Sequence, residues 1–240
     1  QEFTRDLEAK ERFVREAQAA SSLEHPNICN VHEIGETADG QIFIVMAYYE
    51  GESLHEKIKD GPIELEATVE IATQIAQGLA KAHEQGIVHR DIKSANVHIT
   101  KDNVVKILDF GLAKLGNNSK LTKEHTMMGT LTYVSPEQLH GTEVDHRADI
   151  WSFGVVLYEM LTGELPFKNE HDTAVMYAII NEDPKPASAV RSSVPIGLVR
   201  IINKALQKEK QDRYQNMEEL LDDLLKMDAE ALKRTSRIGL

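Results

Sequence analysis

The segment His89-Arg90-Asp91-Ile92-Lys93-Ser94-Ala95-Asn96 (residues 89–96) carries a carboxylate, an ammonium and an amide within six residues, between a predicted helix and a predicted strand. The Asp91 carboxylate in such a segment can take or orient the proton of a hydroxyl group. The Lys93 ammonium can neutralise phosphate, and the Asn96 amide can hold a divalent metal. The segment therefore predicts a site for phosphate chemistry.

A second segment, Asp109-Phe110-Gly111, follows Asn96 by thirteen residues at the end of a predicted strand. It offers another hard oxygen ligand beside a glycine, which permits an unusual backbone conformation. Alone, this tripeptide most often only ends a strand. With each residue type at about one position in twenty, the five fixed positions of the two segments recur by chance roughly once in 10,000 chains of this length.

Composition limits the classes of protein to which the chain can belong. Its 240 residues, 41% of them hydrophobic, can bury a core in one large domain or two small lobes. The net charge of -12 would repel nucleic acid, so no nucleic-acid partner is expected. Cys29 is the single cysteine, which excludes an internal disulfide framework and suits a reducing, cytoplasmic location. No run approaches the ~18 apolar residues of a membrane span.

Hydrophobic periodicity predicts the order helix, small sheet and then many helices, which is typical of the α+β class. Short β-branched runs at 28–34 and 41–47 predict a hairpin, and 97–100 and 104–108 predict two further strands. A helix at 148–161 is apolar on nearly every side and should form the centre of the larger lobe. Further helices are predicted at 5–23, 64–84, 172–181, 196–207 and 216–226, and a loop at 116–124.

The segments 89–96 and 109–111, followed by Ser135-Pro136-Glu137, resemble the catalytic loop and the two later motifs of the protein kinase family, in the same order. The resemblance covers about residues 5 to 228. It implies a two-lobed α+β fold with a truncated N-lobe, which keeps helix C and two strands, and a mainly helical C-lobe. The expected parts are a partial N-lobe and hinge (1–49), a C-lobe (50–228) and a tail or linker (229–240).

The resemblance implies that ATP and Mg²⁺ are the cofactors and assigns roles around them. Asp91 is expected to be the catalytic base, Lys93 to contact the transferring phosphate, and Asn96 and Asp109 to bind Mg²⁺. Thr130 should bond Asp91 and Lys93.

Other positions are expected to bind the nucleotide. By resemblance, Met46 is the gatekeeper, Ala47, Tyr48 and Tyr49 form the hinge whose backbone bonds the base, and Ser53 lies beside the ribose. His98 stands where kinases usually place an apolar side chain under the adenine. A buried imidazole without a partner costs about 1 to 3 kcal/mol, so weakened ATP binding is expected.

The resemblance also identifies supporting residues. Asp149 resembles the buried aspartate that braces the catalytic loop, and Arg213 resembles the arginine that pairs with Glu137. Glu16 resembles the helix glutamate that pairs with the strand lysine of an active kinase. The remaining structural positions of the two motifs are His89, Phe110 and Gly111.

Serine/threonine specificity is expected from Lys93, two residues after Asp91, and from Gly129-Thr130 ahead of Tyr133. The sequences of these motifs resemble those of bacterial members of the family. The substrates would then be proteins with Ser or Thr, including the chain itself through a homodimer.

Arg90 resembles the arginine that captures a phosphorylated activation loop. Thr126 is the first candidate for that phosphate and Thr122 the second, since a phosphate adds about -1.5 to -2 of charge for Arg90 to pair.

Two readings remain open because the family's Gly-x-Gly-x-x-Gly loop and strand lysine are not found. The first glycine is Gly35, and Lys10 lies in a predicted helix. In one reading this is a fragment, inactive or weakly active, of an active Mg-ATP-dependent serine/threonine kinase. In the other the chain is a non-catalytic pseudokinase or protein-interaction module.

Overall fold

The computed structural model describes the backbone of residues 23–39, 41–110 and 131–238, with side chains up to residue 227. The predicted helix at 5–23, except for its last residue, and the predicted loop at 116–124 lie outside the described residues. Within the described ranges, five short strands come before β5 ends at Ile107, with two α-helices between the third strand and the fourth, and only helices follow, so the predicted α+β class is confirmed.

Two small antiparallel sheets form the first part of the described chain. β1 (Val31–Glu36) pairs with β2 (Ile42–Met46), with Glu36 opposite Ile42, which confirms the predicted hairpin although β1 begins three residues later than the run at 28. The second sheet has the order β3 (Gly51–Ser53), β4 (Val97–Thr100), β5 (Val105–Ile107). β3 was not predicted because its polar residues become a strand only by pairing with β4.

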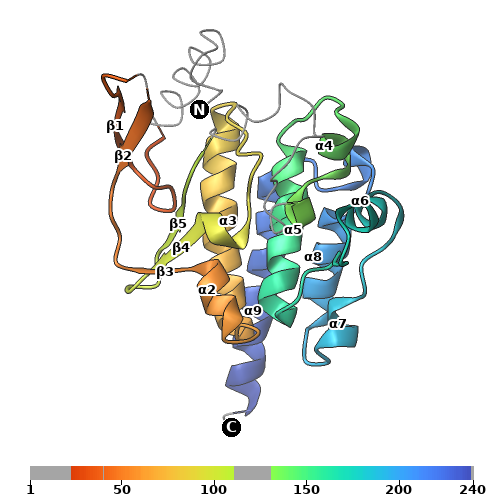
Figure 1. Ribbon diagram of the computed structural model, residues 1–240. Helices are drawn as coiled ribbons and strands as arrows, with labels where there is room; N and C mark the ends of the chain where they lie inside the picture. The colour runs from red at the N-terminus through yellow and green to blue at the C-terminus, as the bar shows by residue number, and fades with distance from the viewer. Residues whose placement is uncertain (1–22, 40, 111–130, 239–240) are drawn as a thin grey trace.

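Helices make up the rest, and their bounds largely follow the predictions. They are α2 (Leu54–Lys59), α3 (Leu65–Glu84), α4 (Pro136–His140), α5 (Arg147–Thr162), α6 (Asp172–Asn181), α7 (Ala187–Val190), α8 (Ile196–Ala205) and α9 (Met217–Ile238). In Figure 1, α5 stands between α3 and α9 on one side and α6 and α8 on the other, with the sheets beyond α3. The short helices α2, α4 and α7 were not predicted.

The end of α3 shows how the sequence sets a boundary. Gly86 adopts a left-handed φ of 72°, and its N–H donates to the carbonyl of His83 while the N–H of Ile87 donates to that of Ala82. These bonds form a Schellman motif, which satisfies the last helix carbonyls. The chain can therefore turn directly from α3 toward the catalytic loop.

α5 is the centre of the helical part, as predicted. Every residue from Ala148 to Thr162 is buried, and Gly163 ends the helix with a φ of 72°. Gly154 lies where a Cβ would stand 2.8 Å from Cβ of Ala205, so the absence of a side chain lets α8 approach α5 closely.

α9 continues to Ile238, so the predicted end at residue 226 is wrong. The physical reason is that residues 227–238 hold neither glycine nor proline and are rich in good helix formers. The backbone therefore runs without a break through residue 228, where the C-lobe was expected to end.

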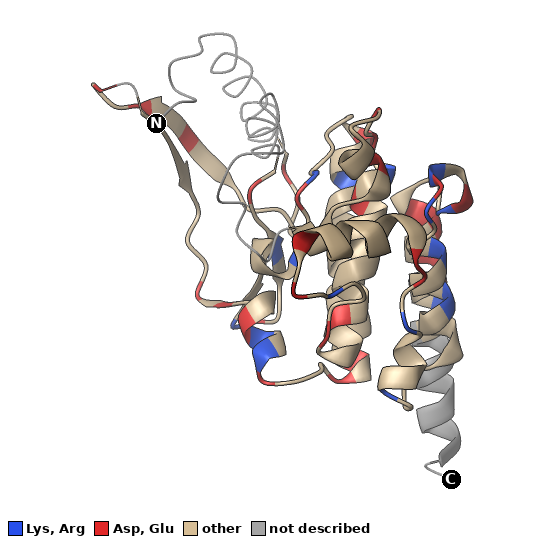
Figure 2. Ribbon diagram, turned by 45° about the vertical axis from the view of Figure 1, so that its right-hand side comes forward, with Lys and Arg blue, Asp and Glu red and all other residues tan. Residues whose placement is uncertain are grey.

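None of the helices in the described part of the chain is both long and apolar enough to cross a membrane. Figure 2 shows Asp and Glu interspersed with Lys and Arg over the described helices and loops. Charge is therefore mixed over the surface of these helices.

Candidate active site

The catalytic loop rests on one buried carboxylate, that of Asp149 in the first turn of α5. Its Oδ2 accepts the N–H of His89 at 2.8 Å, and its Oδ1 accepts the N–H of Arg90 at 2.7 Å. Arg90 has a φ of 66°, a conformation that is unfavourable for a residue with a side chain. The two bonds hold the backbone in this conformation just before Asp91.

The environment of Asp149 keeps its carboxyl charged. Complete burial by itself raises the pKa of Asp149, but the hydrogen bond and charge of His83, the charge of His89 and the N–H of Arg90 bring it below its ordinary value. A buried carboxylate is tolerated when it is paired in this way. Its contribution to stability is present above the ordinary pKa of aspartate and is lost as the pH falls through the lower pKa of the folded protein.

His83 completes this arrangement and was missed as a functional position. Its Nε2 lies 2.8 Å from Oδ2 of Asp149, although the two residues are 66 positions apart. In the sequence His83 only marked one face of α3. A histidine near the C-terminus of an otherwise apolar helical face was the available signal, but its partner could not be read from spacing.

Asp91 lies at the centre of a polar cluster. Its Oδ2 accepts a hydrogen bond from Nζ of Lys93 at 2.7 Å and from Nδ2 of Asn96 at 3.1 Å. Nδ2 of Asn96 also donates to the backbone carbonyl of Asp91 at 2.8 Å. The three side chains predicted from the loop are thus brought together, with the carboxylate held by an ammonium and an amide.

The segment at 109–110 is tied to the same loop. The N–H of Leu108 donates to the carbonyl of Asn96 at 2.9 Å, and Nε2 of His89 lies 2.8 Å from the carbonyl of Leu108. The rings of His89 and Phe110 meet edge to face with centroids 4.6 Å apart. Asp109, exposed and with a φ of 60°, therefore follows directly after a contact with the backbone of Asn96.

The chemistry of these donors fits Mg²⁺. The amide nitrogen of Asn96 is engaged with Asp91, so its oxygen is the atom suited to a cation. Asp109 adds an exposed carboxylate. Over the residues that the structure covers, no group of three or more His, Cys, Asp or Glu could hold a metal. Few protein ligands are typical of Mg²⁺ sites, where phosphate and water supply the other oxygens.

The expected hinge residues connect the two small sheets. Met46 ends β2, and the N–H of Ala47 donates to the carbonyl of Asn30 at 2.9 Å. Tyr48 is 88% exposed, while the ring of Tyr49 lies 4.6 Å from Nζ of Lys106. The side chains of the two tyrosines therefore differ, one free in solvent and one held by a cation–π contact.

Ser53 and His98 are opposite each other across the second sheet. The Ser53 hydroxyl accepts the N–H of Glu56 at 3.1 Å and caps α2 in a capping box. Nε2 of His98 is buried and, among the described residues, finds no hydrogen-bond partner. His98 also pairs with Lys106 of β5. The three polar residues form one row across the sheet, because directly paired residues share a face.

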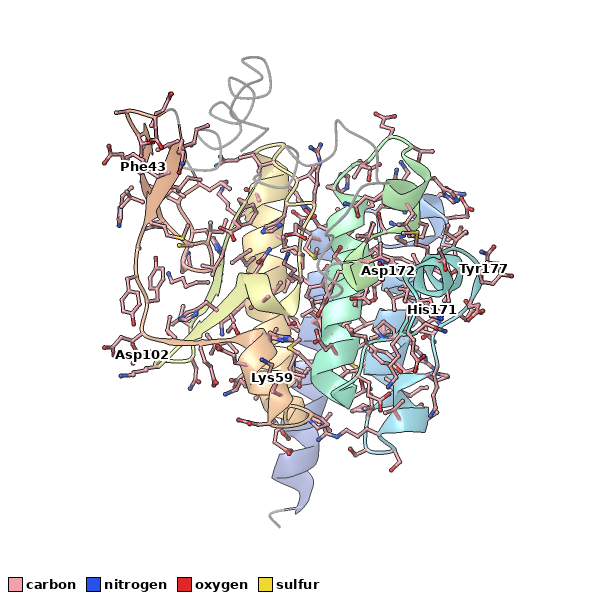
Figure 3. All side chains as sticks on the ribbon, in the orientation of Figure 1. Phe43, Lys59, Asp102, His171, Asp172 and Tyr177 are labelled. Carbon is pink, nitrogen blue, oxygen red and sulfur yellow. The ribbon has the colours of Figure 1, made fainter. Side chains whose placement is uncertain are left out.

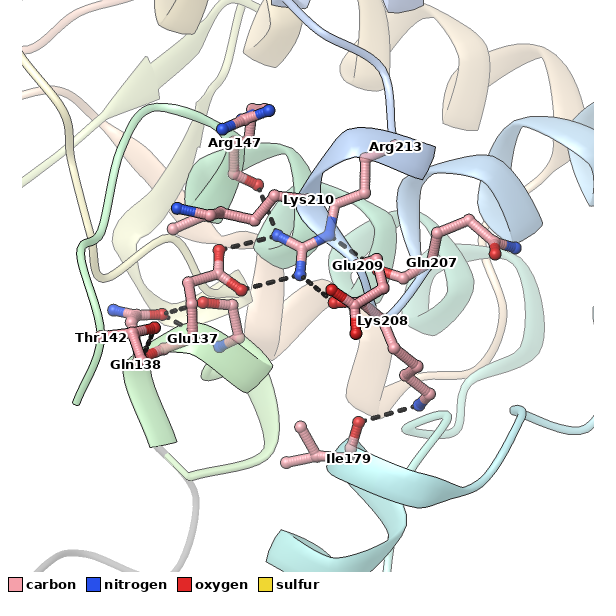
Figure 4. A network of polar contacts seen from close by, with 12 residues as sticks. Glu137, Gln138, Thr142, Arg147, Ile179, Gln207, Lys208, Glu209, Lys210 and Arg213 are labelled. Carbon is pink, nitrogen blue, oxygen red and sulfur yellow. Dashed lines mark hydrogen bonds and ion pairs between the residues drawn. The ribbon is translucent and has the colours of Figure 1, made fainter. Parts of the chain in front are cut away.

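The expected pair of Glu137 and Arg213 is formed and is fully buried. Figure 4 shows the guanidinium between the glutamate and three backbone carbonyls. Its Nη1 and Nη2 each donate to one oxygen of Glu137 at 2.7 Å. The same guanidinium donates to the carbonyls of Arg147, Gln207 and Lys208. The pair thus joins α4 to the start of α5 and to the segment after α8.

Lys208, beside this pair in Figure 4, was missed by the sequence analysis. Its Nζ donates to the carbonyl of Ile179 at 2.8 Å, in the last turn of α6, and lies 4.3 Å from the ring centroid of Phe167 and 5.1 Å from that of Trp151. Burial lowers the pKa of Lys208 to about 8. A cation at a helix C-terminus is favourable, so Lys208 fastens α6 to the core.

Five predicted positions, namely Glu16, Gly111, Thr122, Thr126 and Thr130, lie outside the described residues.

Comparison of the sequence with known proteins identifies the family to which it is similar. A family model for the protein kinase domain matches residues 2–231. A probable serine/threonine-protein kinase of Clostridium acetobutylicum is 42% identical over 93% of this chain and 34% of its own length. The serine/threonine-protein kinase PknB of Mycobacterium leprae is 39% identical over 94% of this chain and 37% of its own. The chain therefore spans about a third of the length of these relatives.

We expect Arg213→Met to lower the free energy of unfolding by about 3–5 kcal/mol, because it leaves the Glu137 carboxylate buried without its cation. Urea unfolding measures the loss. Lys57→Met is the matched control, since its partner Glu52 belongs to an exposed ion pair of 3.1 Å. That control should change stability by less than about 1 kcal/mol. Equal losses for both variants would contradict the role given to the buried pair.

Proposed function

The chain belongs to the protein kinase family, as a catalytic domain of the bacterial serine/threonine type, and we propose that it transfers the γ-phosphate of ATP to Ser and Thr hydroxyls of protein substrates. The observation that carries the proposal is the contact of Asp91 with Lys93 and Asn96 on a loop braced by Asp149. We further propose residues 1–49 as N-lobe and hinge, 50–228 as C-lobe and 229–240 as tail or linker.

The proposed mechanism assigns a task to each residue of the cluster. Asp91 orients the substrate hydroxyl and takes its proton, which contributes typically 10²–10⁴-fold in rate. Asn96 and Lys93 hold that carboxylate in place, and the Lys93 ammonium also neutralises the phosphate as it transfers. When bound by Asn96 and Asp109, Mg²⁺ supplies positive charge to the ATP phosphates.

The nucleotide is proposed to lie against the hinge and the row of polar residues on the second sheet. The backbone of residues 47–49 would bond the base, with Met46 behind it and Ser53 beside the ribose. His98 would lie under the base, where its unpartnered Nε2 weakens the contact. We also propose Glu16 as the helix glutamate that pairs with the strand lysine of an active kinase, and Thr130 as a hydrogen-bond partner of Asp91 and Lys93.

The proposed location is the cytoplasm, since ATP is available there and the lone Cys29 is a free, buried thiol. The alternative is a non-catalytic pseudokinase or protein-interaction module, with which the weakened ATP contact proposed at His98 is compatible. The measurement below decides between them.

Asp91→Asn should reduce phosphate transfer at least about 100-fold, because the amide cannot accept the hydroxyl proton. Transfer is measured with γ-labelled ATP on the protein itself and on Ser- and Thr-containing peptides. Asp102→Asn is the control, as this exposed aspartate lies in the turn between β4 and β5, as Figure 3 shows. Transfer by Asp91→Asn equal to that by Asp102→Asn, or no transfer by the full-length wild-type protein, would contradict the proposed function.

His98→Leu should bind ATP about fivefold more tightly, because the apolar side chain removes a buried nitrogen that has no partner among the described residues. The fivefold change corresponds to a binding free energy on the order of 1 kcal/mol. Calorimetric titration with Mg-ATP gives the affinity. The exposed His140 of α4 offers the matched control, His140→Leu. Weaker ATP binding by His98→Leu would show that the imidazole contributes to the contact instead.

Arg90 is proposed to receive a phosphate on the activation loop, at Thr126 or else Thr122. Nε of Arg90 is buried and lacks a hydrogen-bond partner within the described part of the chain. Phosphopeptide mapping of active protein should find the phosphate, supplied by a second copy of the chain. Phosphatase treatment should lower transfer about tenfold in the wild type and have no effect on Arg90→Gln, since a phosphate makes one to three strong bonds with such a residue. An unmodified loop in active protein would refute this.

A further inference from the structure

A second buried polar cluster lies behind the catalytic loop and joins three side chains that the proposed mechanism does not use. Tyr133 OH lies 2.7 Å from Oε2 of Glu159, Ser94 Oγ lies 3.2 Å from Oε1 of Glu159, and the two hydroxyl oxygens are 3.0 Å apart. All three residues are buried. The cluster is thus a closed ring of three oxygen–oxygen contacts.

Each contact in this ring is a hydrogen bond only if one hydrogen lies between its two oxygens. Ser94 and Tyr133 supply one hydrogen each, and an ionised carboxylate supplies none. With Glu159 ionised, two hydrogens serve three contacts, and one pair of buried oxygens faces each other without a hydrogen. With Glu159 protonated, the three side chains supply one hydrogen each, and all three contacts can be hydrogen bonds.

From this count of donors we infer that Glu159 carries a proton in the folded domain and is a positioning residue, which holds Tyr133 against Ser94 of the catalytic loop. Ser94 directly follows Lys93, and Tyr133 ends the 3-10 turn Leu131–Tyr133, three residues after Thr130. The ring therefore fixes the distance between the catalytic loop and the segment that follows the activation loop.

The groups around Glu159 agree with a neutral carboxyl. Burial raises the pKa of Glu159, and this outweighs the hydrogen bonds from Tyr133 and Ser94 and the charge of His55. His55, from α2, is exposed, and its Nδ1 stands 3.5 Å from Oγ of Ser94. Burial also raises the pKa of Tyr133 well above its usual range, so its hydroxyl keeps its hydrogen.

The inference rests on the proposed function, because the ring acts through the loop that carries Asp91. Two of its members, Tyr133 and Glu159, lie on the helical side, and Ser94 lies on the catalytic loop. Loss of the ring should therefore raise KM for the protein substrate and lower kcat, while KM for ATP changes less.

Three substitutions at one position separate the protonated from the ionised state. Glu159→Gln keeps an acceptor oxygen and a donor group, as the protonated acid does, with one additional N–H, whereas Glu159→Ala removes both and Glu159→Asp shortens the reach. Tyr133→Phe breaks the ring without touching the carboxyl. Glu164→Gln, at an exposed glutamate paired with Lys168, is the control for loss of a carboxylate elsewhere.

The expected result is transfer near the wild-type rate for Glu159→Gln and a loss of about tenfold or more in kcat/KM for Glu159→Ala and Tyr133→Phe, as one broken buried hydrogen bond predicts. As the pH rises above the ordinary glutamate value of about 4.3 and through the raised pKa, the wild type loses stability while Glu159→Gln does not. The melting temperature of Glu159→Gln, relative to that of the wild type, should therefore increase as the pH rises.

A readout independent of activity is the difference infrared spectrum of wild type and Glu159→Gln at neutral pH, which should contain the carbonyl stretch of one protonated carboxyl. Absence of this band, or a loss for Glu159→Gln as large as for Glu159→Ala, would overturn the inference. If the wild type transfers no phosphate, the proposed function fails, but the infrared band and the melting temperatures still decide the state of Glu159.

Discussion

The carboxylate of Asp149 is the constraint on which the candidate site depends. A charge taken completely out of water is tolerated only where hydrogen bonds replace its hydration. Here those bonds come from His83 and from the backbone of His89 and Arg90. The need to satisfy the carboxylate therefore holds an unfavourable backbone conformation at Arg90, and that conformation directs Asp91 toward Lys93 and Asn96.

Further side chains along α5 also hold neighbouring segments through buried polar contacts. Its first turn braces the catalytic loop through Asp149, and Ser152 one turn later donates to the carbonyl of Tyr133 at 2.9 Å. Trp151 packs beneath the guanidinium of Arg213, with 5.1 Å to the ring centroid. Near its end, Glu159 reaches both Ser94 and Tyr133. One buried helix thus sets the relative positions of the catalytic loop, the segment at 131–133 and the Glu137–Arg213 pair.

The side proposed for the nucleotide is built differently. Its residues lie on two small sheets and on the segment that connects them, and the Ser53 hydroxyl already caps α2. His98 brings a buried nitrogen, which has no partner in the described part of the chain, to a place where the purine is proposed to lie. The backbone of the catalytic loop is therefore held by hydrogen bonds to one buried carboxylate, whereas on the side proposed for the base His98 has a buried nitrogen without a partner among the described residues.

The sequence alone determined the α+β class, the catalytic loop and the positions of α3 and α5, because periodicity, caps and short motifs are local properties. It also predicted Asp149 and Arg213 through a resemblance. Tertiary structure alone decided the pairing of β3, the contact of His83 with Asp149, the place of Lys208 and the ring of Ser94, Tyr133 and Glu159. These depend on residues far apart in the chain meeting where water is excluded, and it is the exclusion of water that gives a polar contact its energetic weight.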